Sequence, residues 1–226
     1  AALQAVAISF PIEDAWKTAI ANRSTDFPIT PTLWQSQALL MIGVSGQGGV
    51  AYVANARTGA WCRYTGWDVR CGAVANDRLY FGTNGGKVMR GQNGGTDDGV
   101  AYTARYVPKF TEAGVRSPKV ANHAGVTVKA SENPEFRMAC FANYEIGEYP
   151  TTLPIASESG DVWGTGVWGT FTWGSGASEY AYTIWKAVRA SGYSLAPVVV
   201  VTSNQSSTPA FEILATRLRF EVANSI

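Results

Sequence analysis

Apolar and polar residues alternate over short stretches of the chain, and turn-forming residues separate these stretches. Between residues 39 and 90 the pattern predicts six strands, at 39–44, 50–55, 61–65, 70–75, 78–82 and 87–90. Strands that recur every nine or ten residues with tight links are typical of an antiparallel meander. Because a propeller blade is a four-stranded meander, this region is predicted to be propeller-like.

One helix is predicted ahead of these strands. Pro11 suits the first turn of a helix, and Glu13 and Asp14 suit the positive end of its dipole. Apolar residues then recur at helical spacing: Ala15, Trp16, Ala19 and Ile20. Prolines at positions 28 and 31 prevent the helix from continuing far beyond Arg23.

The second half of the chain also predicts strands, joined by longer links, at 100–107, 125–130, 136–142, 180–188 and 196–202. In the last strand the apolar residues change parity, from Phe211 and Ile213 at odd positions to Leu218 and Phe220 at even ones. A strand cannot slip by one residue without exposing its core face, so we predict a β-bulge between residues 214 and 216.

A domain boundary is expected between Pro108 and Pro118, where proline, glycine and charged residues gather. The predicted fold is therefore all-β, with one short N-terminal helix. Residues 1–110 are expected to form the C-terminal blades of a propeller-like domain, and residues 111–226 a β-sandwich-like domain.

Composition narrows the class of protein further. Only 15% of the 226 residues are charged, against about 25% in an average soluble domain. The apolar fraction of 46% excludes a disordered chain, and the net charge of +1 does not indicate nucleic-acid binding. The sequence contains no run of about 18 apolar residues, so no membrane-spanning helix is predicted. The first residue is alanine and no secretory signal follows, so we expect a processed product or the C-terminal part of a longer protein.

The residues that usually carry catalysis are sparse. His123 is the only histidine, so neither a catalytic triad nor a histidine-rich metal site is expected. Three acidic pairs could serve glycoside hydrolysis on a propeller scaffold, but we expect solvated loop carboxylates: Asp97 with Asp98, Glu132 with Glu135, and Glu145 with Glu148. We expect no enzyme, no metal and no cofactor.

The three cysteines lack metal-ligand spacing. We expect Cys62, Cys71 and Cys140 to be buried free thiols in a reducing compartment. A Cys62–Cys71 bridge across neighbouring strands is the less favoured alternative.

Tryptophan supplies the candidate binding residues. Trp163, Trp168 and Trp173 recur every five residues in a glycine-rich segment, which predicts a looped ribbon with partly exposed rings. Such rings can pack internally, anchor a subunit interface or stack on sugars, and these alternatives stay open. Trp61 and Trp67 are expected in the core. Scattered basic residues between Arg57 and Arg90 indicate a solvated sheet face more than a surface for polyanions.

A long segment carries a family resemblance. It comprises YVANARTGAWCRYTGW at 52–67, NDRLYFG at 76–82 and GKV at 86–88. These motifs resemble the structural proteins of short-tailed bacteriophages known as packaged-DNA stabilisation, tail hub or nozzle proteins. The predicted helix around Ala15-Trp16-Lys17, the pair Trp34-Gln35 and the tryptophan ribbon at 163–174 fit the same pattern. The resemblance covers residues 13–105 well and the remainder loosely.

The resemblance implies a virion protein of the tail, assembled in the host cytoplasm. It implies a ring of copies, often six, that forms part of the DNA channel and docks neighbouring tail or portal-adaptor proteins, with non-specific contact to passing DNA. In that family most of the propeller lies upstream of this region, so we expect a C-terminal fragment or a reduced relative. The alternative function is a glycan-binding receptor-recognition module that uses Trp163, Trp168 and Trp173.

Overall fold

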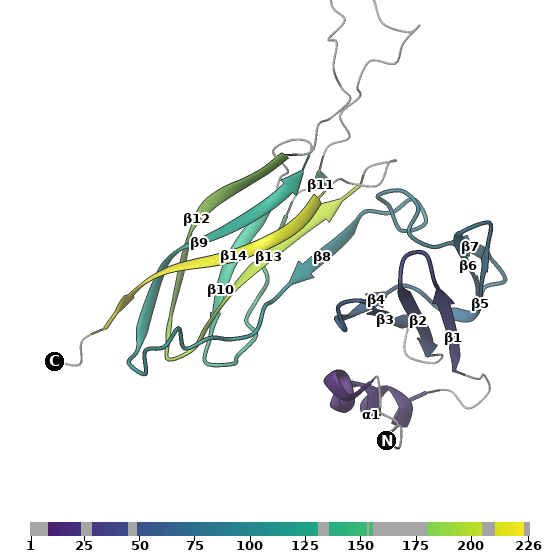
Figure 1. Cartoon of the computed structure of the whole chain (residues 1–226), viewed down its shortest axis with the longest axis horizontal. Coiled ribbons are helices and arrows are strands. Elements are labelled where there is room, and N and C mark those ends of the chain that lie inside the picture. Colours follow the sequence, from purple (N-terminus) through teal and green to yellow (C-terminus); the bar gives the residue numbers. More distant parts are fainter. Residues whose placement is uncertain are drawn as a thin grey trace, which may run out of the picture. The chain divides into compact units, whose positions relative to one another are not determined.

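The computed structural model describes residues 9–23, 29–44, 49–130, 136–152, 154–155, 180–204 and 211–223. The chain forms two compact units, Ala1–Asn93 and Gly94–Ile226, shown in Figure 1. The division therefore lies upstream of the stretch expected between 108 and 118. The reason is that strand β8 (Tyr102–Tyr106) pairs with β13 (Leu195–Ser203), which attaches residues 94–110 to the second unit.

The first unit begins with the predicted helix. A 3₁₀ turn, η1 (Phe10–Ile12), leads into α1 (Glu13–Ala21), with Pro11 in the first turn. The helix buries Ala19 against Val44 and Tyr52. The ring of Trp16 meets that of Tyr52 edge to face, with centroids 5.8 Å apart. The helix prediction is confirmed.

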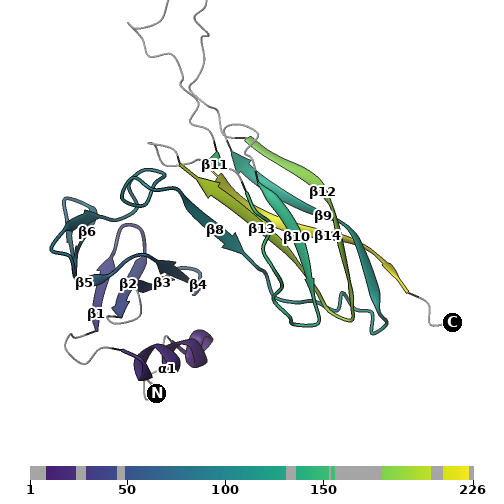
Figure 2. The same ribbon diagram turned by 180° about the vertical axis from the view of Figure 1, so that it is seen from behind.

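Two antiparallel sheets complete the first unit, as Figures 1 and 2 show. One has the order β1-β2-β3-β4, formed by Thr30–Trp34, Leu39–Val44, Val50–Asn55 and Trp61–Thr65. The other has the order β5-β6-β7, formed by Val69–Ala75, Arg78–Thr83 and Val88–Arg90. The six strands predicted between 39 and 90 are confirmed. In the part of the chain that the structure describes, these two sheets do not close into a propeller.

Strand β1 was not among the predicted strands, because Pro31 suggested only the end of the helix. Proline is tolerated in a strand at the edge of a sheet, where a missing N–H group breaks no ladder. β1 is such an edge strand, since it pairs only with β2 in its sheet.

The second unit is a sandwich of two sheets. The first has the order β12-β9-β14, formed by Tyr180–Gly192, Lys119–Ala130 and Phe211–Val222. The second consists of β10 (Arg137–Ala142), β13 and the short parallel strand β11 (Pro154–Ile155), with β8 also paired to β13. Val126 and Val128 of the first sheet pack against Val199 and Val201 of the second. The predicted β-sandwich-like arrangement is confirmed.

Strand β13 is buried over all nine residues, so it does not show the alternation of a half-exposed strand. Its inner face meets the other sheet through Val199. Its outer face, at Val198 and Val200, is covered by Phe110 and Tyr149 from flanking loops. Cover on both faces explains the continuous apolar run in this part of the sequence.

The β-bulge of the last strand lies where the parity change predicts it. Ile213 pairs with Val128, and Ala215 pairs with Thr127, the adjacent residue of the antiparallel strand β9. Leu214 therefore has no partner of its own and is the extra residue. Leu214 is 48% exposed, whereas Phe211, Ile213, Leu218 and Phe220 all pack against the core. The inserted residue restores the core face after the change of parity.

Candidate functional site

The three tryptophans proposed as binding residues, Trp163, Trp168 and Trp173, lie outside the described residues, as do Glu132 and Glu135. Asp97 and Asp98 form a tight turn in which the N–H of Asp97 donates to the Val100 carbonyl at 2.8 Å. Glu145 and Glu148 are exposed on a loop. For these last two pairs, the expected loop carboxylates are confirmed.

His123 and the cysteines occupy separate places. His123 is exposed on β9, and among the described residues no three of the side chains His, Cys, Asp or Glu gather as metal ligands. No helix in those residues is long and apolar enough to cross a membrane. Cys140 is buried, and burial raises the pKa of its thiol to about 11.

The expectation of three buried thiols is wrong for Cys62 and Cys71, which are exposed. Cys62 lies opposite Val53 on β4, the edge strand of its sheet. Cys71 lies on β5 just after a register shift that separates it from the buried Val69. A bridge between them is also contradicted, because all three cysteines are free and β4 and β5 belong to different sheets. The Sγ of Cys62 donates to the Val53 carbonyl at 3.5 Å. Although part of the residue is exposed, desolvation of the thiol raises the pKa of Cys62.

The motif segment at 52–67 builds a hairpin turn. The side-chain Oδ1 of Asn55 accepts from the backbone N–H groups of Arg57 and Thr58, at 2.9 and 3.1 Å. The N–H of Gly59, whose φ is +70°, donates to the Asn55 carbonyl at 2.8 Å. Asparagine and glycine are therefore needed here for a side-chain-supported turn with a positive φ.

The motif segment at 76–82 is tied to the upstream pair Trp34-Gln35. Asn76 and Asp77 have φ values of +49° and +56°, which is typical of a two-residue hairpin turn. The Nε1 of Trp34 donates to the Asp77 carboxylate at 2.9 Å, and the Ser36 hydroxyl donates to the same oxygen. These bonds, from Ser36 first and then Trp34, lower the pKa of Asp77.

An aromatic cluster joins the two sheets of the first unit. Trp67 stacks on Phe81 with centroids 4.7 Å apart and meets Tyr64 edge to face at 4.9 Å. The Tyr64 hydroxyl accepts from the side-chain amide of Gln92 at 3.2 Å. The packing of Trp67 confirms the expectation that it belongs to the core. Trp61 packs against a second cluster, formed by Ala19 of α1 with Val44 and Tyr52.

The cavity beside this cluster is too small for a ligand. Its volume is about 10 Å³, which is the space of one water molecule. Its lining includes Trp34, Trp67, Tyr64 and Thr32, whose buried Oγ1 has no hydrogen-bond partner among the described residues. The described contacts of the motif segments at 52–67 and 76–82 therefore form turns and pack strands together.

Sequence reasoning missed a polar surface on the outer face of sheet β12-β9-β14. We call it the arginine face; it consists of Thr127, Thr183, Trp185, Arg217 and Arg219. The Nη1 of Arg217 donates to the hydroxyls of Thr127 and Thr183, which are themselves 2.8 Å apart. The guanidinium carbon of Arg219 lies 5.5 Å from the ring centroid of Trp185.

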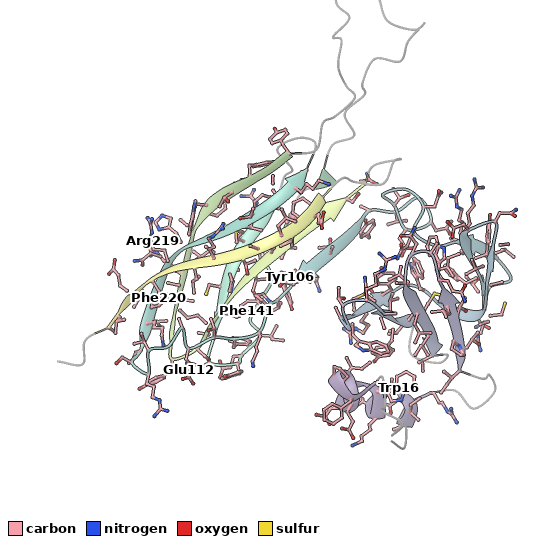
Figure 3. The ribbon with its side chains drawn as sticks, viewed as in Figure 1. Trp16, Tyr106, Glu112, Phe141, Arg219 and Phe220 are labelled. Carbon is pink, nitrogen blue, oxygen red and sulfur yellow. The ribbon has the colours of Figure 1, made fainter. Side chains whose placement is uncertain are left out.

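Gly125 sets the position of the Trp185 ring. A Cβ atom added to Gly125 would lie 2.9 Å from two atoms of that ring, so only glycine lets the ring lie flat on β9. The ring remains 43% exposed. Figure 3 shows Arg219 and its neighbour Phe220 on β14. Phe220 packs against the core, whereas Arg219 is exposed.

The sequence signal for this surface lies in the polar positions of the last strand. Once Leu218 and Phe220 are assigned inward, the alternation turns Arg217 and Arg219 outward together. Their partners Thr127 and Trp185 could not be identified in this way, because they lie on other strands, and Thr127 is 90 positions from Arg217 in the sequence.

Comparison with known proteins gives no match to any family model and none to a curated protein.

Proposed function

We propose that this chain is a structural protein of a bacteriophage short tail and is located in the virion. In this proposal copies of the chain form a ring, six by the family resemblance, around part of the DNA channel. The ring docks neighbouring tail or portal-adaptor proteins, and its contact with passing DNA is non-specific. The task is geometric, so the proposal assigns no catalytic residue.

The observation that carries the proposal is how the motif residues are used. Asn55, Gly59 and the pair Asn76-Asp77 form turns, while Trp34 and Phe81 join neighbouring strands. A motif that encodes turns and strand packing supports a structural role in the tail.

Exposed apolar side chains add a second line of support. In the second unit Tyr144 and Ile146 protrude from the loop after β10, and Val100 protrudes before β8. In the first unit Val88 of β7 and Phe10 are exposed. Contacts with other chains bury apolar side chains and are depleted in charged residues, which fits this exposure and the low charged fraction of the chain.

Labelling of intact phage particles tests the proposal. An antibody against this chain is expected to decorate the tail in negative-stain images, and an antibody against a capsid protein serves as the control. Native mass spectrometry of the purified full chain is expected to show a closed oligomer. Absence of label from tails, or a monomer that turns over a polysaccharide, would contradict the proposal.

A further inference from the structure

Both guanidinium groups of the arginine face are held in place by neutral groups. Arg217 is fixed by the hydroxyls of Thr127 and Thr183, and Arg219 by the ring of Trp185. Among the described residues, no carboxylate forms an ion pair with either arginine. Among those residues, then, no carboxylate neutralises either charge, and both groups are oriented before a ligand arrives.

Several donors of these two side chains remain available. A guanidinium has five N–H donors, of which Arg217 uses Nη1 for the two threonines. An arginine stacked on an aromatic ring keeps its edges free for bidentate bonds to an anion. The two residues are two positions apart on β14, which separates their backbones by roughly 6.6 Å.

Acidic residues lie on both sides of Arg217 and Arg219 along β14. Glu212 lies before them on β14, opposite Lys129 in the register. Glu221 lies after them, and its carboxylate accepts from the side-chain amide of Asn122 at 3.0 Å. A long polyphosphate laid along the strand would meet a carboxylate at either end. A short ligand with spaced anionic groups avoids this repulsion.

We propose that the arginine face binds an acidic saccharide, in which carboxylates of uronate-type sugars pair with Arg217 and Arg219. Charge complementarity supplies the main attraction, because carboxylate and guanidinium match in bidentate geometry. The exposed edge of Trp185, whose ring already lies against Gly125 and Arg219, borders the sugar chain. Thr127 and Thr183 lie beside it to meet sugar hydroxyls. Side chains that follow one another along a strand suit a linear sugar chain.

This site does not depend on the proposed tail function. It uses none of the tryptophans between 163 and 173, and it lies within the sandwich unit alone. A chain that binds acidic sugars without joining a tail would contradict only the tail proposal. A tail protein that ignores acidic sugars would contradict only this site.

The test is a titration of the full chain with trigalacturonate, followed by saturation-transfer NMR. Binding is expected in the millimolar range and is expected to weaken as salt rises. Arg217→Gln and Arg219→Gln are each expected to weaken binding about fivefold to tenfold, because a charge-assisted bidentate contact is lost. Arg57→Gln, at an exposed turn of the first unit, is the matched control and is expected to leave binding unchanged.

Two further ligands make the result decisive. Maltotriose, which is neutral, is expected to give no saturable binding, and an oligothymidylate of equal charge is expected to bind more weakly than trigalacturonate. The proposal is overturned if trigalacturonate does not bind, or if Arg57→Gln weakens binding as much as Arg219→Gln. Tighter, arginine-dependent binding of the oligothymidylate would also overturn it, in favour of a nucleic-acid surface.

Discussion

Replacing Phe81 with alanine should remove the central contact between the two sheets of the first unit. Phe81 is 4% exposed on β6, and its ring stacks on Trp67 at 4.7 Å with an interplanar angle of 24°. Trp34, Met41 and Val53, from the other sheet, belong to the same buried cluster. The truncation would leave a cavity that strands on both sides cannot fully close.

The expected loss is about 3–5 kcal/mol of unfolding free energy, which is the range for buried Phe→Ala substitutions. Loss of the aromatic pair is part of that figure, at about 0.5–1.5 kcal/mol beyond the buried area. A domain of this size is stabilised by only about 5–15 kcal/mol. The variant should therefore lose a large share of the stability of the first unit.

Urea unfolding of the full chain, followed by tryptophan fluorescence, measures the effect. With an m-value near 2 kcal/mol/M, the midpoint of the transition of the first unit should fall by roughly 2 M. The matched control is Phe10→Ala, the same substitution at a residue that is 73% exposed, with an expected change below about 0.5 kcal/mol. A loss below about 1 kcal/mol for Phe81→Ala, or equal losses for both variants, would refute the assigned packing.

Three further predictions concern pH, thiol reactivity and the bulge. Because hydrogen bonds lower the pKa of Asp77 from its ordinary 3.8, its carboxylate stabilises the first unit above that pH. This contribution should disappear as the pH falls through the lowered pKa, and acid titration of unfolding should show a weaker decline in Asp77→Asn. With a thiol reagent at pH 8, exposed Cys71 should react in the folded protein and Cys140 only after unfolding; equal rates would contradict the burial of Cys140. Deletion of Leu214 should restore unbroken alternation and change the melting temperature by less than about 5 °C, whereas loss of folding would show that the bulge is required.

Local pattern was enough to predict much of this fold. Strands 39–44, 50–55 and 61–65 have the predicted limits, because each is bounded by residues that favour turns. The bulge at Leu214 followed from parity alone, since side chains of a strand alternate with a period of two. Two strands were longer than predicted by several residues: β9 begins at Lys119 and β12 continues to Gly192.

The early start of β9 shows what local pattern cannot supply. Lys119 is fully buried, and its Nζ donates to the carbonyls of Ser117 and Tyr193, at 3.1 and 2.6 Å. From its residue type, a lysine at the end of a strand is expected to have its side chain exposed to solvent. Only the approach of Tyr193, 74 residues away, supplies the carbonyl that makes burial possible.

By itself the sequence determined most of the strands and turns, the helix and the all-β class, because these depend on contacts between near neighbours along the chain; β1 and β11 were not predicted. Tertiary structure decided three other features: the division at Asn93, the exposure of Cys62 and Cys71, and the assembly of the arginine face. Each of these depends on which distant strands pair and which face each strand turns to solvent. That choice is made by the packing of whole sheets, where residues far apart in sequence share one core.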